Sequence, residues 1–131
     1  MAFDFKNPTT QMLGRWQPWH AGHTALFKKA LLQSGQVCIM VRDVSGVSGG
    51  EGQDDNPFDY YEVYNNIVKA LKEEGFRLNV EYQIIRVPNI VDISYGRGVG
   101  YTFTEHDLGE EIHNISATKI RAKMRENGEL E

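Results

Sequence analysis

Two histidines, His20 and His23, are the side chains of this sequence whose type and spacing best suit chemistry. An imidazole with an ordinary pKa near 6.5 can offer neutral or cationic N–H groups to phosphate oxygens on which negative charge grows during displacement. Gly14, Pro18 and Gly22 flank the pair. Glycine lets the backbone approach a phosphate closely, and proline stiffens a turn. The stretch predicts N–H donors aimed at the oxygens of a bound phosphate.

A second stretch rich in phosphate-binding groups lies near the end of the chain. Ser116, Thr118 and Arg121 stand at the start of an expected helix that ends at Gly128. A helix N-terminus attracts anions through its unpaired N–H groups and its dipole. Ser116 as a plain N-cap contributes about 1 kcal/mol, and this role is compatible with binding a phosphate. A solvated helix face is the alternative for Thr118 and Arg121.

The histidine pair has two other interpretations. One is a capping or core histidine beside a solvated one. The other is a metal site completed by His106 and His113. No carboxylate or cysteine stands at a recognisable ligand spacing for such a site.

The elements that must position the pair follow from the pattern of apolar residues. A short strand is expected over residues 10–13 and a helix over residues 22–34. Residues 36–41 form an apolar run without polar alternation, which is typical of a parallel strand buried on both faces. Strand, helix and strand make a right-handed βαβ unit, which places the histidines at the carboxyl ends of the strands.

The rest of the chain continues this alternation less clearly. Residues 45–55 are glycine-rich and polar, and predict a mobile loop. Asn56 is expected to cap a helix whose first turn opens with Pro57. A third strand is expected over residues 80–87, before a proline that ends it. Short strands and loops are expected over residues 89–106.

Composition limits the class of protein. The chain has 131 residues, 40% of them apolar, which is enough for one folded domain with an N-terminal arm over residues 1–8. With 14 basic and 18 acidic residues its net charge is −4, which argues against a nucleic-acid-binding protein. No secretory signal or membrane-spanning run is visible, so a cytoplasmic location is expected. The one cysteine, Cys38, can make no intrachain disulfide and is expected to be buried.

Residues 14–23 resemble the HxGH signature of the cytidylyltransferase-like nucleotidyltransferase superfamily, and residues 115–121 resemble its ISxTxxR signature. The start of the first stretch is most similar to archaeal-type nicotinamide mononucleotide adenylyltransferases, as are residues 56–58 and 87–90. The compact length is similar to that of glycerol-3-phosphate cytidylyltransferases. The resemblance implies an α/β, Rossmann-like three-layer fold with a central parallel sheet in a single domain.

The resemblance also implies roles for the residues that match. The histidines would stabilise the α-phosphate in its transition state, and Arg121 would neutralise the departing pyrophosphate. The serine and threonine of the second motif would hold the β- and γ-phosphates, and Mg²⁺ would accompany the triphosphate. The resulting catalytic residues are His20, His23 and Arg121, and the nucleotide-binding residues are Gly14, Arg15, Gly22, Ser116 and Thr118.

Two further arginines are candidates for binding a phosphorylated acceptor. Arg42 directly follows the second expected strand; an ion pair with Asp43 is the alternative. Arg97 stands between glycines in residues 95–100, where a flexible hairpin is the alternative. Trp16 and Trp19, in place of the phenylalanines of the similar motif, either line the acceptor pocket or pack.

These observations predict an enzyme that transfers a nucleoside monophosphate, with AMP favoured, from a nucleoside triphosphate to a phosphorylated small molecule and releases pyrophosphate. Cytidylyl transfer from CTP to a sugar or polyol phosphate is the alternative. A nucleotide-binding sensor without turnover is an alternative of another class. Small members of the superfamily often pair, so a homodimer is possible; neither a nucleic acid nor a membrane is an expected partner.

Overall fold

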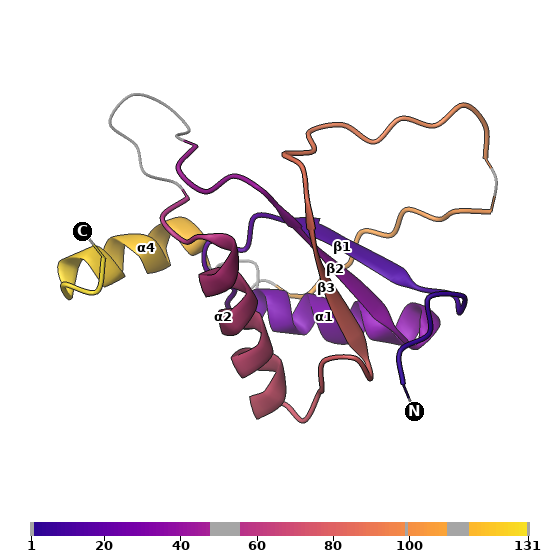
Figure 1. Cartoon of the computed structure of the whole chain (residues 1–131), viewed down its shortest axis with the longest axis horizontal. Coiled ribbons are helices and arrows are strands. Elements are labelled where there is room, and N and C mark those ends of the chain that lie inside the picture. Colours follow the sequence, from indigo (N-terminus) through magenta and orange to yellow (C-terminus); the bar gives the residue numbers. More distant parts are fainter. Residues whose placement is uncertain (1, 48–55, 99, 110–115, 131) are drawn as a thin grey trace.

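The computed structural model describes residues 2–47, 56–98, 100–109 and 116–130 (Figure 1). In chain order its elements are β1 (Thr10–Gly14), α1 (Ala21–Ser34), β2 (Val37–Arg42), α2 (Tyr60–Glu73), β3 (Tyr82–Val87) and α4 (Ala117–Glu126). The strands form a three-stranded parallel sheet in the order β1-β2-β3. This confirms the α/β class and the parallel sheet, and it is compatible with a Rossmann-like fold.

The register places the carboxyl ends of all three strands at one edge of the sheet. Gly14 pairs with Val41, and Arg42 pairs with Val87. The turn between β1 and α1 begins at this edge. The helix α4 lies beyond the same edge, far from the N-terminal arm (Figure 1).

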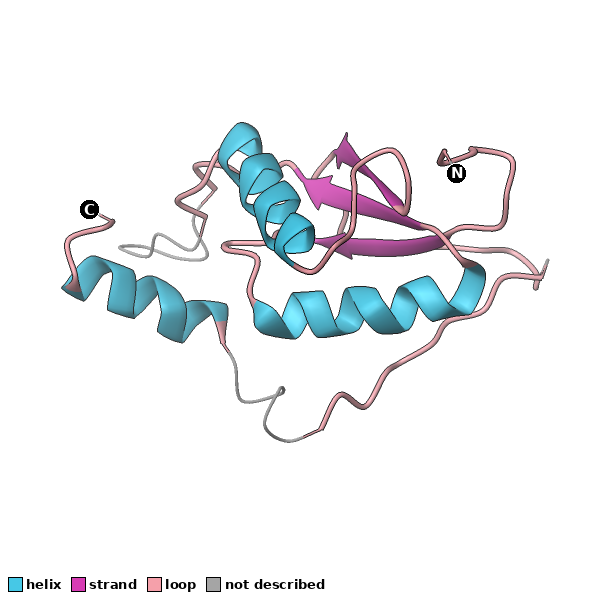
Figure 2. Ribbon diagram, turned by 90° about the horizontal axis from the view of Figure 1, so that it is seen from below, coloured by secondary structure: helices cyan, strands magenta, loops and turns pink. Residues whose placement is uncertain are grey.

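Both crossover helices cover the same face of the sheet, because two right-handed crossovers that progress in one direction put their helices on one side. Phe27 of α1 and Ile67 and Leu71 of α2 belong to one core with the strand residues Val37 and Ile39. Figure 2 shows the three strands next to the two helices, above the long horizontal helix α1 and to the right of α2. Burial of this shared apolar surface is the main force that holds the three elements together.

The strand β2 was expected to be buried on both faces, and the structure corrects this. Its residues alternate: Val37, Ile39 and Val41 are buried, whereas Cys38 and Met40 are only half-buried. Since the helices α1 and α2 cover one face, the described residues form two layers. The third layer of the expected fold stays a prediction.

Helix α2 begins later than expected and has a different cap. Asp59 is its N-cap: Oδ1 of Asp59 accepts a hydrogen bond from the Glu62 N–H at 2.8 Å, and Oε1 of Glu62 accepts one from the Asp59 N–H at 3.2 Å. This reciprocal capping box satisfies two N–H groups of the first turn. The expected cap, Asn56, instead uses its side chain in contacts with Arg15 and Val47.

Two other expected segments differ from the structure, and most of a third lies outside the described residues. The third strand begins at Tyr82 rather than at residue 80, because residues 77–81 form a turn in which the Val80 N–H donates to the Arg77 carbonyl. Described residues 89–106 contain no strand or helix. Residues 48–55 of the expected mobile loop lie outside the described residues.

The N-terminal arm is tied to the sheet by one buried glutamine. The Gln36 amide donates to the Asp4 carbonyl at 2.6 Å and accepts from the Asp4 N–H at 3.2 Å. The Phe3 N–H donates to the Asn79 carbonyl at 2.8 Å. Among the described helices, none has the length and apolar character needed to cross a membrane.

Candidate active site

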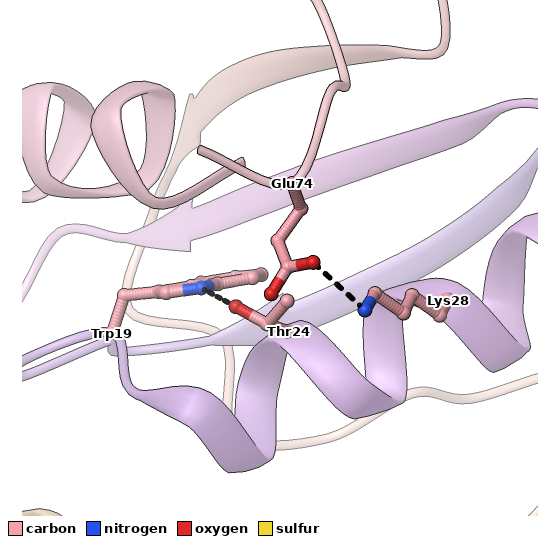
Figure 3. A network of polar contacts seen from close by, with 4 residues as sticks. All are labelled: Trp19, Thr24, Lys28 and Glu74. Atoms are coloured by element: carbon pink, nitrogen blue, oxygen red, sulfur yellow. Dashed lines mark hydrogen bonds and ion pairs between the residues drawn. The ribbon is translucent and has the colours of Figure 1, made fainter. Parts of the chain in front are cut away.

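Two buried tryptophans give the turn between β1 and α1 its shape. The Trp16 indole N–H donates to the Met40 carbonyl at 3.1 Å. The Trp19 indole N–H donates to the Thr24 hydroxyl at 2.8 Å (Figure 3). Each indole thus buries its apolar body while its polar N–H is satisfied. Of the two interpretations for this pair, the structure supports packing.

Gly14 is required by the first of these tryptophans. A Cβ added at Gly14 would lie 2.8 Å from the Trp16 ring. Trp16 has a positive φ of 53°, which is rare for a bulky residue and turns its indole back over the end of β1. The glycine therefore makes room for an indole, and its predicted contact with nucleotide stays a prediction.

The two histidines form a capping box at the start of α1. Nδ1 of His20, the N-cap, accepts the Gly22 N–H at 3.0 Å, and Nδ1 of His23 accepts the His20 N–H at 3.1 Å. Their rings stack with centroids 3.6 Å apart. Because Nδ1 is the acceptor in both neutral rings, the ring proton of each resides on Nε2. Both imidazoles therefore carry an Nε2–H that no described residue accepts.

Burial keeps both rings uncharged at neutral pH. Desolvation, followed by the charge of neighbouring His20, lowers the pKa of His23 from 6.5 to about 3. Desolvation also lowers the pKa of His20. His23 is further enclosed by the Trp16 and Trp19 rings, at centroid distances of 4.8 and 5.4 Å. His20 caps α1, as the structural alternative predicted, and both histidines are half-buried, so neither is fully solvated.

The second motif meets this turn through a buried arginine. Arg121, on α4, is only 3% exposed. Its Nη1 donates to the Gln17 carbonyl at 2.6 Å across 104 residues of sequence, and its Nη2 donates to the Thr118 hydroxyl at 3.3 Å. The solvated-face interpretation is therefore wrong for Arg121. Thr118 is exposed but holds the guanidinium.

Ser116 caps α4 as expected. Its Oγ accepts the Lys119 N–H at 3.4 Å, a long bond on an exposed surface. The N-terminus of α4 lies at the same edge of the sheet as the capped start of α1 (Figure 1). Two helix starts, a pair of neutral imidazoles and a buried guanidinium converge there.

Gln17, which the sequence analysis did not single out, and Asn56, which it assigned to a helix cap, join the segment before α2 to the turn. Gln17 is buried, and its amide donates to the Phe58 carbonyl at 3.0 Å and accepts the Phe58 N–H at 2.9 Å. Asn56 is also buried; it accepts a hydrogen bond from Arg15 at 3.2 Å and donates to the Val47 carbonyl at 2.5 Å. The exposed Arg15 is thus positioned at the rim of the site. The position of Gln17 within the first motif is the sequence feature that could have identified it as a site residue.

The two acceptor candidates have different outcomes. Nη2 of Arg42 donates to Oδ1 of Asn89 at 2.7 Å, while Asp43 forms its ion pair with Arg86 at 3.0 Å. The alternative pairing of Arg42 with Asp43 is therefore wrong. Arg97 is exposed, and in the described part of the chain no hydrogen bond joins it to the histidines or to Arg121.

The metal-site interpretation gains no support. Within the described residues no three histidine, cysteine or carboxylate side chains are close enough to hold a metal ion. His113 lies outside the described residues.

The chain matches no protein-family model and no curated protein. The functional argument therefore depends on the geometry of the site and on the motifs.

Proposed function

We propose that the protein is a nucleotidyltransferase that moves a nucleoside monophosphate, AMP in the first instance, from a triphosphate to a phosphorylated small molecule. The observation that carries this proposal is the hydrogen bond from Arg121 to Gln17, which brings the second motif to the turn of the first. Each motif alone has an ordinary structural role. Their convergence at the carboxyl edge of a parallel sheet, where such folds bind ligands, favours a shared triphosphate.

In this mechanism an oxygen of the acceptor's phosphate attacks the α-phosphorus in line. A new P–O bond forms as the bond from the α-phosphorus to its leaving oxygen breaks, and pyrophosphate departs with the electron pair. The Nε2–H groups of His20 and His23 donate to the α-phosphate oxygens as their charge grows. Because the attacking phosphate is already an anion, neither histidine needs to take a proton. Positioning and charge stabilisation supply the catalysis.

The α4 helix would hold the rest of the triphosphate. Arg121 supplies a fixed positive charge beside the leaving pyrophosphate, and its orientation is set by Thr118 and Gln17. Ser116 stands at the helix N-terminus, where N–H groups attract phosphate oxygens. Mg²⁺ would bind with the triphosphate and offset its charge, with phosphate and water oxygens as its ligands.

The proposal has two alternatives that one experiment separates. CTP in place of ATP, with a sugar or polyol phosphate, uses the same residues. A nucleotide sensor without turnover would keep the pocket and lose the chemistry. A homodimer and a cytoplasmic location remain predictions.

The test is thermal unfolding with Mg²⁺ and ATP, CTP, GTP or UTP in turn, followed by pyrophosphate release with phosphorylated acceptors. At one hundred times its dissociation constant a ligand adds about 2.7 kcal/mol of stability. We expect a shift selective for ATP and release of pyrophosphate. A shift selective for CTP moves the assignment to cytidylyl transfer, and binding without release identifies a sensor. No shift with any of the four overturns the proposal.

A further inference from the structure

A cavity of about 420 Å³ opens at the carboxyl edge of the sheet, on the face that α1 and α2 leave uncovered. Leu13 and Arg42 line it from β1 and β2, where they alternate with the buried residues Met12 and Val41. The segment after β3 supplies its other wall. The cavity is lined by Leu13, Arg42, Ile90, Val91, Asp92 and Ile93. Its volume is in the range of small-molecule sites.

Arg42 brings an unneutralised positive charge to this cavity. Among the described residues its hydrogen-bond partner is a neutral amide oxygen, Oδ1 of Asn89 at 2.7 Å. Its Nε is buried and has no acceptor within the described residues. The neighbouring carboxylate, Asp43, is occupied by Arg86. A guanidinium has five N–H donors in a planar fork that matches a phosphate, so Arg42 can still bind an oxyanion.

Asp92 brings a negative charge to the same cavity. It accepts a hydrogen bond from the Ser94 hydroxyl and forms no ion pair with Arg42. The walls include the aliphatic side chains of Leu13, Ile90 and Ile93. A complementary ligand carries an anion at one end, a hydrogen-bond donor at the other, and a short carbon skeleton between them. The carboxylate disfavours a ligand that is anionic at both ends.

We propose that this cavity is the acceptor subsite, in which Arg42 binds the phosphate of a monoester and Asp92 selects a hydroxyl or ammonium group at its far end. The inference rests on the proposed function for the acceptor's fate, but the binding itself does not require the reaction. Arg42 directly follows β2, at the edge of the sheet where the histidine turn begins. Asp92 becomes a specificity-determining residue that the motifs do not include.

The experiment is a titration of isoleucine-methyl-labelled protein, followed by NMR, with four probes. Glycerol 3-phosphate and O-phosphoethanolamine carry a phosphate and a donor, propyl phosphate lacks the donor, and glycerol lacks the phosphate. We expect the methyl signals of Ile90 and Ile93 to shift, and those of the core residues Ile39 and Ile67 to stay. The first two probes should bind at least fivefold more tightly than propyl phosphate, and glycerol should not bind.

Three variants assign the contacts. Arg42→Gln should weaken both donor-bearing phosphates at least tenfold. Asp92→Asn should reduce their affinity for the site toward that of propyl phosphate and leave propyl phosphate unchanged. Arg77→Gln is the control: it removes the same charge from an exposed arginine that precedes β3, at the opposite end of that strand from the cavity, and it should bind all probes normally. The unshifted core methyl signals verify that each variant is folded.

The outcomes separate this inference from the proposed function. If a phosphorylated acceptor yields pyrophosphate while the Ile90 and Ile93 signals stay in place, the cavity is not the acceptor site and nucleotidyl transfer stands. If the probes bind with the expected dependence on Arg42 and Asp92 but no triphosphate gives pyrophosphate, the cavity is a binding site and the proposed transfer fails. Equal affinity for all three phosphates in wild type removes Asp92 from the proposal.

Discussion

The starts of α1 and α4 converge on one site, but they are held there by different means. The start of α1 is closed by two imidazoles in a capping box and enclosed by buried indoles. The start of α4 has one serine cap with a long hydrogen bond, and its link to the turn is the Arg121 side chain. The first is built into the hydrophobic core, whereas the second is attached by the polar contact of Arg121 and by partly buried apolar residues such as Met124 at the edge of the core. Substitutions at the start of α1 should therefore lower both the folding stability and the chemical rate. Substitutions at the start of α4 should impair the site and leave the core folded.

The largest expected effect is that of His23→Ala on the chemical rate. Loss of one preorganised donor to a developing charge lowers kcat by about 10²- to 10³-fold, and loss of the capping acceptor lowers stability by about 1 kcal/mol. Single-turnover kinetics, triphosphate affinity and thermal unfolding measure the three quantities. His106→Ala is the control, since His106 lies outside both motifs. Equal losses in rate and in triphosphate affinity would contradict a transition-state role.

Arg121→Met should release α4 without unfolding the core. The change keeps an apolar side chain of similar length and removes hydrogen bonds of a charged donor, which are each worth about 1.5–3 kcal/mol when buried. Hydrogen exchange should show faster exchange in α4 and unchanged protection in α1 and the strands. Lys123→Met, on the same helix but exposed, should change neither. Protection of α4 that survives Arg121→Met would mean that apolar packing of Met124 holds this helix.

Gly14→Ala tests the packed side of the comparison. Because the new Cβ would meet the Trp16 ring at 2.8 Å, the indole must move, and overpacking of this kind costs about 1–3 kcal/mol. Urea unfolding measures the loss. Gly96→Ala is the control, since a Cβ there meets nothing within 4 Å. Wild-type stability for Gly14→Ala, with altered triphosphate binding, would instead assign this glycine to the nucleotide.

Thr24→Val removes the acceptor of the Trp19 indole N–H with little change in shape. A buried donor left without a partner costs about 1–3 kcal/mol. The same helix offers a contrast in Lys28, whose ion pair with Glu74 at 3.0 Å is exposed (Figure 3). Lys28→Met should cost less than about 1 kcal/mol. Similar losses for the two variants, measured by urea unfolding, would show that the indole contact is not a determinant of this turn.

The smallest expected effect at neutral pH concerns the protonation of the histidine pair. Its effect on the free energy of unfolding grows as the pH is lowered. The unfolded chain binds protons at these histidines below about pH 6.5, whereas the folded chain resists until about pH 3 at His23. Stability should therefore fall as the pH is lowered through this window. His23→Gln keeps a capping acceptor at this helix position and should show a shallower fall in thermal unfolding. Identical pH profiles would mean that His23 titrates normally in the folded protein.

Most elements could be predicted because their signals are local. Apolar runs of strand or helix length, the glycine after α1 and the serine before α4 each act within a few residues, and the structure confirms these elements. The errors arose where two local signals compete. Asn56 and Asp59 are both good N-caps, and the choice between them depended on Arg15 and Val47, which lie elsewhere in the chain.

The sequence by itself determined the βαβ order and the place of the histidine pair at the start of a helix, since hydrophobic periodicity and turn chemistry are short-range. Only the tertiary structure decided which groups meet. Arg121 is buried where the Gln17 carbonyl, 104 residues away, accepts its hydrogen bond. The imidazole of His23 is neutral because Trp16 and Trp19 help to exclude water from it. Desolvation and long-range hydrogen bonding depend on three-dimensional neighbours, and no window of sequence contains them.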